Sequence, residues 1–225
     1  MSLTLGFDIY GTLIDPHGVV VKLTETIGDD AAAFSKLWRD KQLEYTFRKG
    51  LMQHYENFAV CTRQALDYTD IVMETGLDDA TKQALMQTYR VLPAFDDVQS
   101  SLEMVSEKGF RLFAFSNGVA DAVQGLLEHA GIDQFFEGVV SVDSIQTYKP
   151  NPKVYEFFLD STGSKAQHSW LVSSNPFDVM GAVSVGMNAA WLKRAAAATA
   201  VFDPWGIPPT IQIESLTSLV DLPTS

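Results

Sequence analysis

The chain has 225 residues, of which 46% are hydrophobic and 20% charged, the balance of a globular protein with a sizeable core. Its formal net charge is −12 and its 16 Lys and Arg residues form no basic run, which argues against nucleic acid as a partner. The lone Cys61 excludes an intrachain disulfide and fits a reducing compartment. No apolar run approaches the roughly 20 residues of a membrane span and the N-terminus lacks a basic leader, so we expect a cytoplasmic protein without a membrane partner.

The first element is a short apolar run that predicts a strand ending at Asp8. The segment 16–92 differs from the rest, because its periodic stretches all have helical spacing and no strand-like run interrupts them. Pro93 marks the expected return to the core, since a proline seldom continues a helix. The sequence therefore predicts a core domain, residues 1–15 and 93–225, with an inserted helical cap subdomain, residues 16–92.

After residue 93, strand-like runs alternate with helical stretches. We predict strands within 109–118, 139–143, 169–175 and 187–192, and helices over 121–132 and 151–164. This alternation indicates an α/β fold with a doubly wound, Rossmann-like parallel sheet. Residues 195–198, all Ala, predict a loop or short helix, and the proline-containing tail is expected to be irregular until a last strand or helix near its end.

Polar residues follow several of the predicted strands, namely Asp8, Ser116, Asp143 and residues 173–175. In a doubly wound sheet, ligands bind in the crevice beyond the carboxyl ends of the strands. A helical insertion directly after the Asp8 strand would lie over that crevice as a lid and exclude water. A lone Asp at a strand end is more often a turn-former or a helix cap than a catalytic residue, so the role of Asp8 depends on the other motifs.

Five stretches combine into a more specific pattern: FDIYGTL, LWRDKQLEYTF, FSNG, YKPNPKVYE and VSSNPFD..GA. In this order, from residue 7 to about 194, they resemble the type II L-2-haloacid dehalogenases, a branch of the haloacid dehalogenase superfamily. The first stretch is typical of the whole superfamily, and the second narrows the resemblance to the dehalogenases. The resemblance implies a homodimer that uses water to convert short L-2-haloacids to D-2-hydroxy acids.

By this resemblance Asp8 is a nucleophile that displaces halide and leaves an aspartyl ester for water to cleave. In the superfamily's phosphatases, the residue two positions later is typically a second Asp that protonates the leaving alkoxide. A halide needs no proton, so Tyr10 at this position favours dehalogenation. The alternative for Tyr10 is a wall of the core.

The same comparison bears on metal, because the phosphatases pair the nucleophile with further acids that hold magnesium. Here Ser174 and Asn175 stand where an acidic pair would be expected. Asp178 remains, and it could orient or deprotonate the water that hydrolyses the ester. We therefore expect no metal and no other cofactor.

Further roles follow from the resemblance. Arg39 shares a helix face with Leu43 at i+4, and it would stabilise the departing halide together with Asn175 and Phe177. Phe177 replaces a Trp that is common in the family. Asp40 is a second departure, at a position where a neutral polar residue is expected, and we predict that it points away from the pocket.

The remaining predictions concern substrate and nucleophile. Ser116 and Asn117 would bind the substrate carboxylate, while Tyr10, Leu43 and Phe58 would form an apolar wall around its side chain. Around the nucleophile we predict four more residues with related tasks. Lys149 would keep Asp8 ionised, Thr12 and Ser173 would hydrogen-bond it or the water-activating acid, and Tyr155 would lie near the active carboxylates.

Two other functions remain open from the residues alone. One is a phosphohydrolase on the same scaffold, which Tyr10 and the depleted acidic motif disfavour. The other is a non-catalytic small-anion binding protein in which Asp8 is only structural. Convergence of two acids and two bases on one crevice argues against it, because buried charges are costly without a task.

Overall fold

The computed structural model describes residues 2–194, 201–204 and 206–223. Six parallel strands form one sheet in the order β3-β2-β1-β4-β5-β6. The strands are β1 (Thr4–Phe7), β2 (Arg111–Ser116), β3 (Gly138–Ser141), β4 (Ser169–Ser173), β5 (Asn188–Leu192) and β6 (Ile211–Ile213). Residues of β1 and β4 are buried throughout, as in parallel strands covered on both faces. The predicted doubly wound α/β fold is confirmed.

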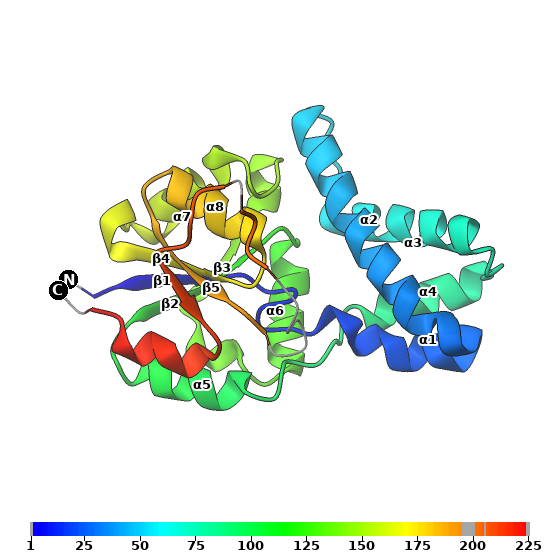
Figure 1. Cartoon of the computed structure of the whole chain (residues 1–225), viewed down its shortest axis with the longest axis horizontal. Helices are drawn as coiled ribbons and strands as arrows, with labels where there is room; N and C mark the ends of the chain where they lie inside the picture. Colours follow the sequence, from blue (N-terminus) through cyan, green and yellow to red (C-terminus); the bar gives the residue numbers. More distant parts are fainter. Residues whose placement is uncertain (1, 195–200, 205, 224–225) are drawn as a thin grey trace.

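Helices cover the sheet on two sides (Figure 1). They are α5 (Val98–Ser106), α6 (Ala120–His129), α7 (Pro152–Thr162) and α8 (Pro176–Ser184), with the 3-10 helices η3 (Asp133–Phe135), η4 (Val142–Ile145), η5 (Ala166–His168) and η7 (Leu216–Asp221). Apolar residues of α5, α6 and η7 belong to one buried cluster, and those of α7 and α8 to another. Two cores thus sandwich the sheet, one on each face.

The strand order reverses at β1, which has β2 on one side and β4 on the other. Asp8 directly follows β1, and its backbone N–H continues the sheet by donating to the Val172 carbonyl at 3.0 Å. Ligand sites of doubly wound sheets lie at this switch point. The topology therefore places Asp8 at the position where a ligand is expected.

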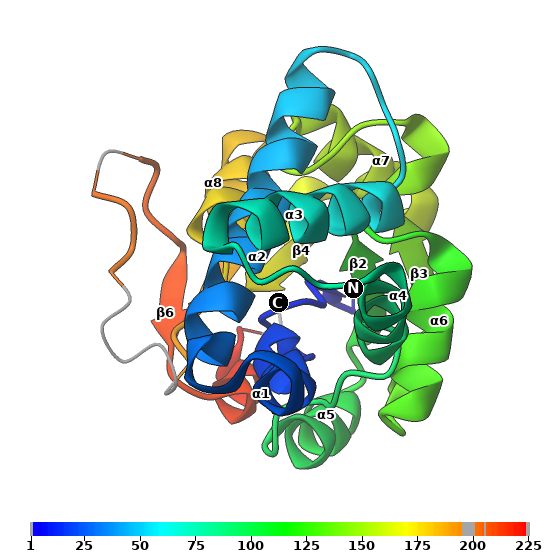
Figure 2. The ribbon, with the colours of Figure 1, turned by 90° about the vertical axis from the view of Figure 1, so that its right-hand side faces the viewer.

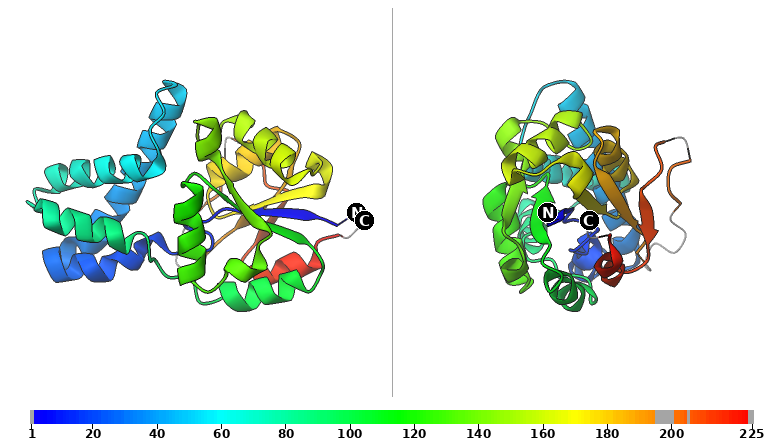
Figure 3. Two further views of the ribbon diagram at one scale, coloured as in Figure 1. Left: turned by 180° about the vertical axis from the view of Figure 1, so that it is seen from behind. Right: turned by 90° about the vertical axis from the view of Figure 1, so that its left-hand side faces the viewer.

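The segment that follows β1 is helical throughout its regular elements. It contains η1 (Pro16–Val19), α1 (Val20–Ile27), η2 (Gly28–Asp30), α2 (Ala31–Leu51), α3 (Phe58–Met73) and α4 (Asp79–Thr88). Figures 1 and 3 show these helices beyond one end of the sheet, opposite the chain termini. The chain leaves and re-enters the core at one place, because Ile14 bridges to Ala94 and the Asp15 N–H donates to the Pro93 carbonyl at 2.9 Å.

Helix α2 is the longest element, and α3 crosses it (Figure 2). Its buried positions include Phe34, Trp38, Gln42 and Thr46, which are spaced by four residues and so form one stripe. The Trp38 indole N–H donates to the Thr62 carbonyl of α3 at 2.8 Å. The face of α2 that carries this stripe therefore packs against α3, and the opposite face of α2 points toward the sheet.

Contacts between the loop that joins α2 to α3 and the core involve tyrosines. The Tyr55 hydroxyl donates to the Asp143 carboxylate at 2.5 Å, and the Tyr148 hydroxyl bonds the Glu56 carbonyl. The Tyr55 and Tyr148 rings lie 5.1 Å apart. The helical segment is therefore fastened to the core beside residue 149.

Some predicted boundaries differ from the structure. The run 139–143 turns into η4 after Ser141, because the Ser141 hydroxyl accepts the Asp143 N–H and caps the 3-10 turn. The tail forms β6 and η7, as expected of a last strand or helix, whereas residues 195–198 lie outside the described part of the chain. No helix in the described ranges is long and apolar enough to cross a bilayer.

Candidate active site

The Asp8 carboxylate, at 8% exposure, accepts hydrogen bonds from four side chains. Its Oδ2 accepts from Thr12 Oγ1 at 3.0 Å, Ser173 Oγ at 3.2 Å and Asn175 Nδ2 at 2.7 Å. Its Oδ1 accepts from Lys149 Nζ at 3.1 Å. These donors stabilise negative charge on Asp8, and they leave Oδ1 as the less engaged oxygen.

Lys149 is 2% exposed and uses all three of its N–H donors. Besides Asp8, its Nζ donates to Asp178 Oδ2 at 2.8 Å and to the Phe115 carbonyl at 2.9 Å. Burial by itself would lower the pKa of Lys149, but the carboxylates of Asp178 and Asp8 outweigh burial and raise that pKa above its ordinary value. Lys149 is therefore a fixed cation between two carboxylates.

Asp178 lies in the first turn of α8 and is fully buried. Its Oδ1 accepts the Tyr155 hydroxyl at 2.8 Å, opposite the oxygen that Lys149 contacts. Burial raises the pKa of Asp178 to about 6, Lys149 opposes that rise, and the charge of Asp8 adds to it. Asp178 is therefore mostly ionised at neutral pH and readily protonated just below it.

Local sequence explains how these groups meet. Asn175 precedes α8 and Pro176 is its first residue, which suits a proline because the missing N–H would have no partner there. A Cβ at Gly181 would lie 2.3 Å from the Tyr155 hydroxyl oxygen. Only glycine thus lets α7 approach α8 closely enough for Tyr155 to reach Asp178.

The loops after β1 and β4 are joined by side chain to backbone bonds. The Ser174 N–H donates to Thr12 Oγ1 at 2.9 Å, and the Asn175 N–H donates to Ser173 Oγ at 3.1 Å. Thr12 and Ser173 thus bind Asp8 and the loop at once, which fixes their hydroxyls relative to the carboxylate.

Helix α2 brings Arg39 to the same place. Arg39 Nη2 donates to the Tyr10 carbonyl at 3.2 Å, and Asn175 Nδ2 reaches that carbonyl at 3.3 Å. Arg39 Nη1 donates to Gln42 Oε1 at 2.6 Å. Arg39 and Asn175 therefore meet beside Asp8, although they come from segments 136 residues apart, that is, 175 minus 39.

Ser116 ends β2 and Asn117 follows it, and both side chains already accept a hydrogen bond. The Ser116 hydroxyl accepts the Gly118 N–H at 3.0 Å, and Asn117 Oδ1 accepts the Lys149 N–H at 3.0 Å. The Ser116 hydroxyl keeps its proton to donate. Asn117 instead anchors the backbone of the residue that bridges the carboxylates.

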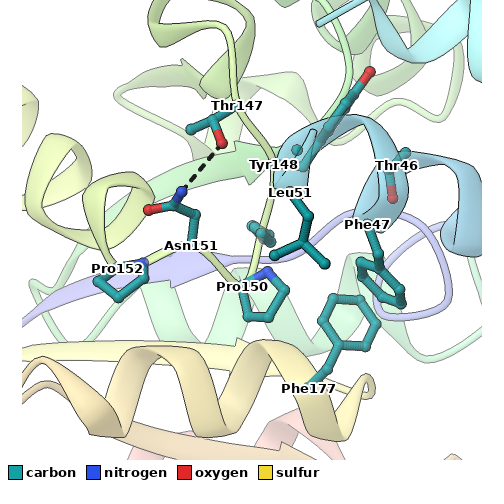
Figure 4. Close-up of a pocket in the computed structure, with 11 residues that line it drawn as sticks. Thr46, Phe47, Leu51, Thr147, Tyr148, Pro150, Asn151, Pro152 and Phe177 are labelled. Carbon is teal, nitrogen blue, oxygen red and sulfur yellow. Dashed lines mark hydrogen bonds between the residues drawn. The ribbon is translucent and has the colours of Figure 1, made fainter. Parts of the chain in front are cut away.

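Three cavities lie where the helical segment meets the core. The Phe177 cavity, of about 450 Å³, is lined by Phe47, Leu51, Lys149, Pro150 and Phe177 among others (Figure 4). The Phe58 cavity, of about 220 Å³, is lined by Tyr10, Phe58, Tyr89, Arg90 and Gly118 among others. The Arg39 cavity, of about 280 Å³, is lined by Arg39, Leu43, Ser174, Asn175 and Trp191 among others.

This division separates residues that were predicted to act together. Phe177 packs edge-on against Phe47, with ring centroids 5.0 Å apart, and lines a different cavity from Arg39 and Asn175. Tyr10 and Phe58 lie side by side, with centroids 5.5 Å apart, whereas Leu43 lines the Arg39 cavity. Asp40 is exposed and pairs with Lys36 at 2.6 Å, although it borders the Arg39 cavity.

Sequence reasoning missed Gln42, which is fully buried. Besides binding Arg39, its Nε2 donates to Thr62 Oγ1 at 2.6 Å. Its position in the sequence could have indicated this role, because Gln42 falls in the same helical stripe as Phe34, Trp38 and Thr46. A polar side chain buried in such a stripe requires a hydrogen-bond partner.

Within the described ranges, no three His, Cys, Asp or Glu side chains gather in a way that could hold a metal ion. The space between Asp8 and Asp178 is taken by the Lys149 ammonium group.

Comparison with known proteins agrees with this geometry. The profile of a family described as haloacid dehalogenase-like hydrolase matches residues 6–192. The chain belongs to the haloacid dehalogenase-like hydrolases. This confirms the resemblance found in the sequence.

Individual members of the family match this hydrolase over nearly its whole length. An (S)-2-haloacid dehalogenase of Pseudomonas sp. strain YL is 36% identical, over 97% of this chain and 93% of that protein. A haloacetate dehalogenase H-2 of Moraxella sp. strain B is 34% identical, over 97% and 96%. The solved structure of L-2-haloacid dehalogenase from Xanthobacter autotrophicus with chloropropionic acid covalently bound has a TM-score of 0.88 at 27% identity, covering 98% of this chain and 97% of that one.

Proposed function

We propose that this hydrolase is an (S)-2-haloacid dehalogenase, which converts short L-2-haloacids to D-2-hydroxy acids through an aspartyl ester. The observation that carries the proposal is the array of Asp8, Lys149 and Asp178, which holds a charged nucleophile and a second carboxylate around one ammonium group. The names of the similar dehalogenases support the substrate class.

In the first step, Asp8 Oδ1 attacks C2 of the haloacid from the side opposite the halogen. The C–halogen bond breaks as the C–O bond forms, so the configuration at C2 inverts. Arg39 and Asn175 supply N–H donors to the halide as its charge develops. Tyr10 supplies no proton, and a halide leaving group needs none.

In the second step, water attacks the Asp8 carboxyl carbon and gives its proton to Asp178. The oxyanion forms on Oδ2, which three donors from Thr12, Ser173 and Asn175 already surround. Asp178 then returns this proton to the ester oxygen as its bond to the carboxyl carbon breaks, which frees the hydroxy acid, and Asp8 releases the other water proton to solvent and regains its charge. The water oxygen stays in the carboxylate of Asp8.

The substrate itself would lie between the core and the helical segment, residues 16–92, acting as a cap. The Ser116 hydroxyl would bind the substrate carboxylate, and Tyr10 with Phe58 would contact its alkyl group in the Phe58 cavity. A cavity of about 220 Å³ suits a short chain. The cap would exclude water while Arg39 engages the halogen.

No metal is required in this proposal. Lys149 supplies the positive charge between the two carboxylates, and Asn175 replaces an acid by an amide that donates to Asp8. Turnover that disappears in EDTA and returns with magnesium would contradict this part.

We also propose a cytoplasmic homodimer. The lone Cys61 fits a reducing compartment, and Leu51 and Met52 at the end of α2 offer exposed apolar side chains for a second copy. Sedimentation velocity of the purified protein tests the oligomeric state.

The decisive experiment measures halide release from L- and D-2-chloropropionate in EDTA, with Asp8→Asn alongside. We expect halide release from the L isomer only, D-lactate as product, and no halide release by the variant.

A second experiment follows the oxygen atom. One turnover in oxygen-labelled water, with enzyme in excess, should put the label in Asp8. Label found only in the product would refute the ester. Magnesium-dependent cleavage of p-nitrophenyl phosphate, together with no halide release from haloacids, would favour a phosphatase.

A further inference from the structure

The Arg39 cavity contains more cationic and donor groups than the proposed reaction uses. It is lined by Arg39 and Asn175, and Asn175 also contacts Asp8. It is also lined by Lys193 and Arg194, which follow β5. A cavity of about 280 Å³ thus begins one side chain away from the nucleophile.

The charges of this cavity are unequally compensated. Arg194 is neutralised by Asp97 and donates through Nε to the Thr12 carbonyl at 3.1 Å, so its task is to hold the nucleophile loop. Arg39 and Lys193 are not compensated in this way, because no carboxylate oxygen of the described residues lies within 4.0 Å of either side chain's nitrogen atoms.

The two carboxylates that border the cavity differ in their compensation. Asp40 pairs with Lys36, whereas Asp15 accepts the His17 N–H at 2.9 Å and, within the described ranges, has no Lys or Arg nitrogen within 4.0 Å. Two uncompensated cations, Arg39 and Lys193, therefore face one uncompensated carboxylate, which leaves the cavity lining positive in a chain whose net charge is −12.

Ser174 provides an independent observation. Its N–H donates to Thr12 and its carbonyl accepts the Trp191 indole N–H at 3.1 Å. Its hydroxyl is buried and has no hydrogen-bond partner within the described ranges. A buried hydroxyl without a partner is costly, and rotation about χ1 would turn this one toward a ligand in the cavity that Ser174 lines without breaking a hydrogen bond.

We propose that the Arg39 cavity is a second halide site, through which the halide leaves after the first step. The ion would pass from Arg39 and Asn175 to the Ser174 hydroxyl and the Lys193 ammonium group. This role rests on the proposed dehalogenation, which supplies the halide. A cationic exit counteracts the repulsion that an acidic protein exerts on a departing anion.

Trp191 lines the same cavity and reports occupancy directly, because iodide quenches indole fluorescence on contact. The experiment titrates the substrate-free enzyme with potassium iodide, with potassium gluconate holding ionic strength constant. We expect saturable quenching that Trp191→Phe abolishes. Lys193→Gln and Ser174→Ala should each raise the dissociation constant by about threefold to tenfold, the effect of one lost hydrogen bond or charge contact. Lys153→Gln, at an exposed position on α7, is the matched control.

The inhibition constant of bromide against L-2-bromopropionate gives a second readout that does not depend on fluorescence. It should rise in Lys193→Gln and Ser174→Ala and stay unchanged in Lys153→Gln. Linear quenching, or constants equal to wild type in both variants, would overturn the halide site while leaving dehalogenation intact. Saturable, Lys193-dependent iodide binding without any turnover would support the site and refute the reaction on which its role as an exit rests.

Discussion

The core and the cap contribute to the site in different ways. In the core, Asp8, Lys149 and Asp178 are almost fully buried, and each is held by two or more hydrogen bonds. The cap contributes Arg39, a half-buried side chain anchored by Gln42 and one backbone carbonyl. The buried charges of the core must be compensated before substrate arrives, whereas a cap residue can adjust when the halide forms.

This difference predicts how substitutions should behave. A change in the core array should affect stability and chemistry together, because the same contacts serve both. A change at the cap should affect chemistry with little effect on stability. Four predictions test this contrast, from the largest expected effect to the smallest.

Lys149→Met should abolish activity and lower the free energy of unfolding by about 3–5 kcal/mol, because it leaves two buried carboxylates without a cation. The loss should be greater at pH 8 than at pH 5.5. Without Lys149 the folded-state pKa of Asp178 rises further above its unfolded value, so the folded variant binds more protons and loses stability as pH rises. Urea unfolding at both pH values measures this.

The control for this prediction is Lys153→Met, which removes an exposed lysine four residues later. It should leave unfolding and activity unchanged. Equal destabilisation in the two variants would contradict the assignment of Lys149 as the compensating cation.

Asp178→Asn should slow ester hydrolysis by about a thousandfold, a typical contribution of a general base, while leaving the first step possible. One equivalent of halide should be released in a burst, and almost no further halide should follow. Mass spectrometry should then find Asp8 carrying the acid. The exposed Asp160→Asn on α7 is the control, and the absence of both burst and adduct would show that Asp178 is needed earlier.

The hydrolysis rate should fall about tenfold per pH unit below pH 6. Asp178 acts as a base only when ionised, and its raised pKa of about 6 places protonation in this range. Single-turnover release of hydroxy acid, measured from pH 4.5 to 8, gives the profile. A flat profile down to pH 5 would argue against Asp178 as the base.

Gln42→Met should lower kcat/KM about tenfold, equivalent to one lost charged hydrogen bond, because Arg39 loses its side-chain partner. Stability should change by less than in Lys149→Met, since Met fills the same volume at the α2–α3 contact. The exposed Gln83→Met on α4 controls for an added methionine. Unchanged kinetics would show that Tyr10 alone suffices to orient Arg39.

Much of the fold was readable because it is encoded locally. Apolar runs, their alternation with helices and the purely helical segment after residue 15 are properties of short stretches, and they gave the parallel sheet and the insertion correctly. Boundaries were less accurate, as at residues 142–145, where a hydroxyl cap competes with strand propensity.

The predictions of which site residues lie together show the same contrast between local and long-range information. Asp8 follows β1, Ser173 ends β4 and Asn175 lies two residues later. These strands are neighbours in the sheet, so topology alone brings the three residues together. Leu43 and Phe177 were grouped with residues from which the structure separates them. The cavity that each of them lines depends on how α2 packs on the core, which no local pattern encodes.

By itself, the sequence determined the family, the order of the elements and the chemical types at the strand ends. Only the tertiary structure decided that Lys149 bridges Asp8 and Asp178, that Gln42 supports Arg39 and that the Ser174 hydroxyl is left without a partner. The physical reason is the separation along the chain of the residues that interact. Secondary structure follows from neighbours along the chain, whereas compensation of a buried charge depends on groups that only the packed fold brings within a few ångströms.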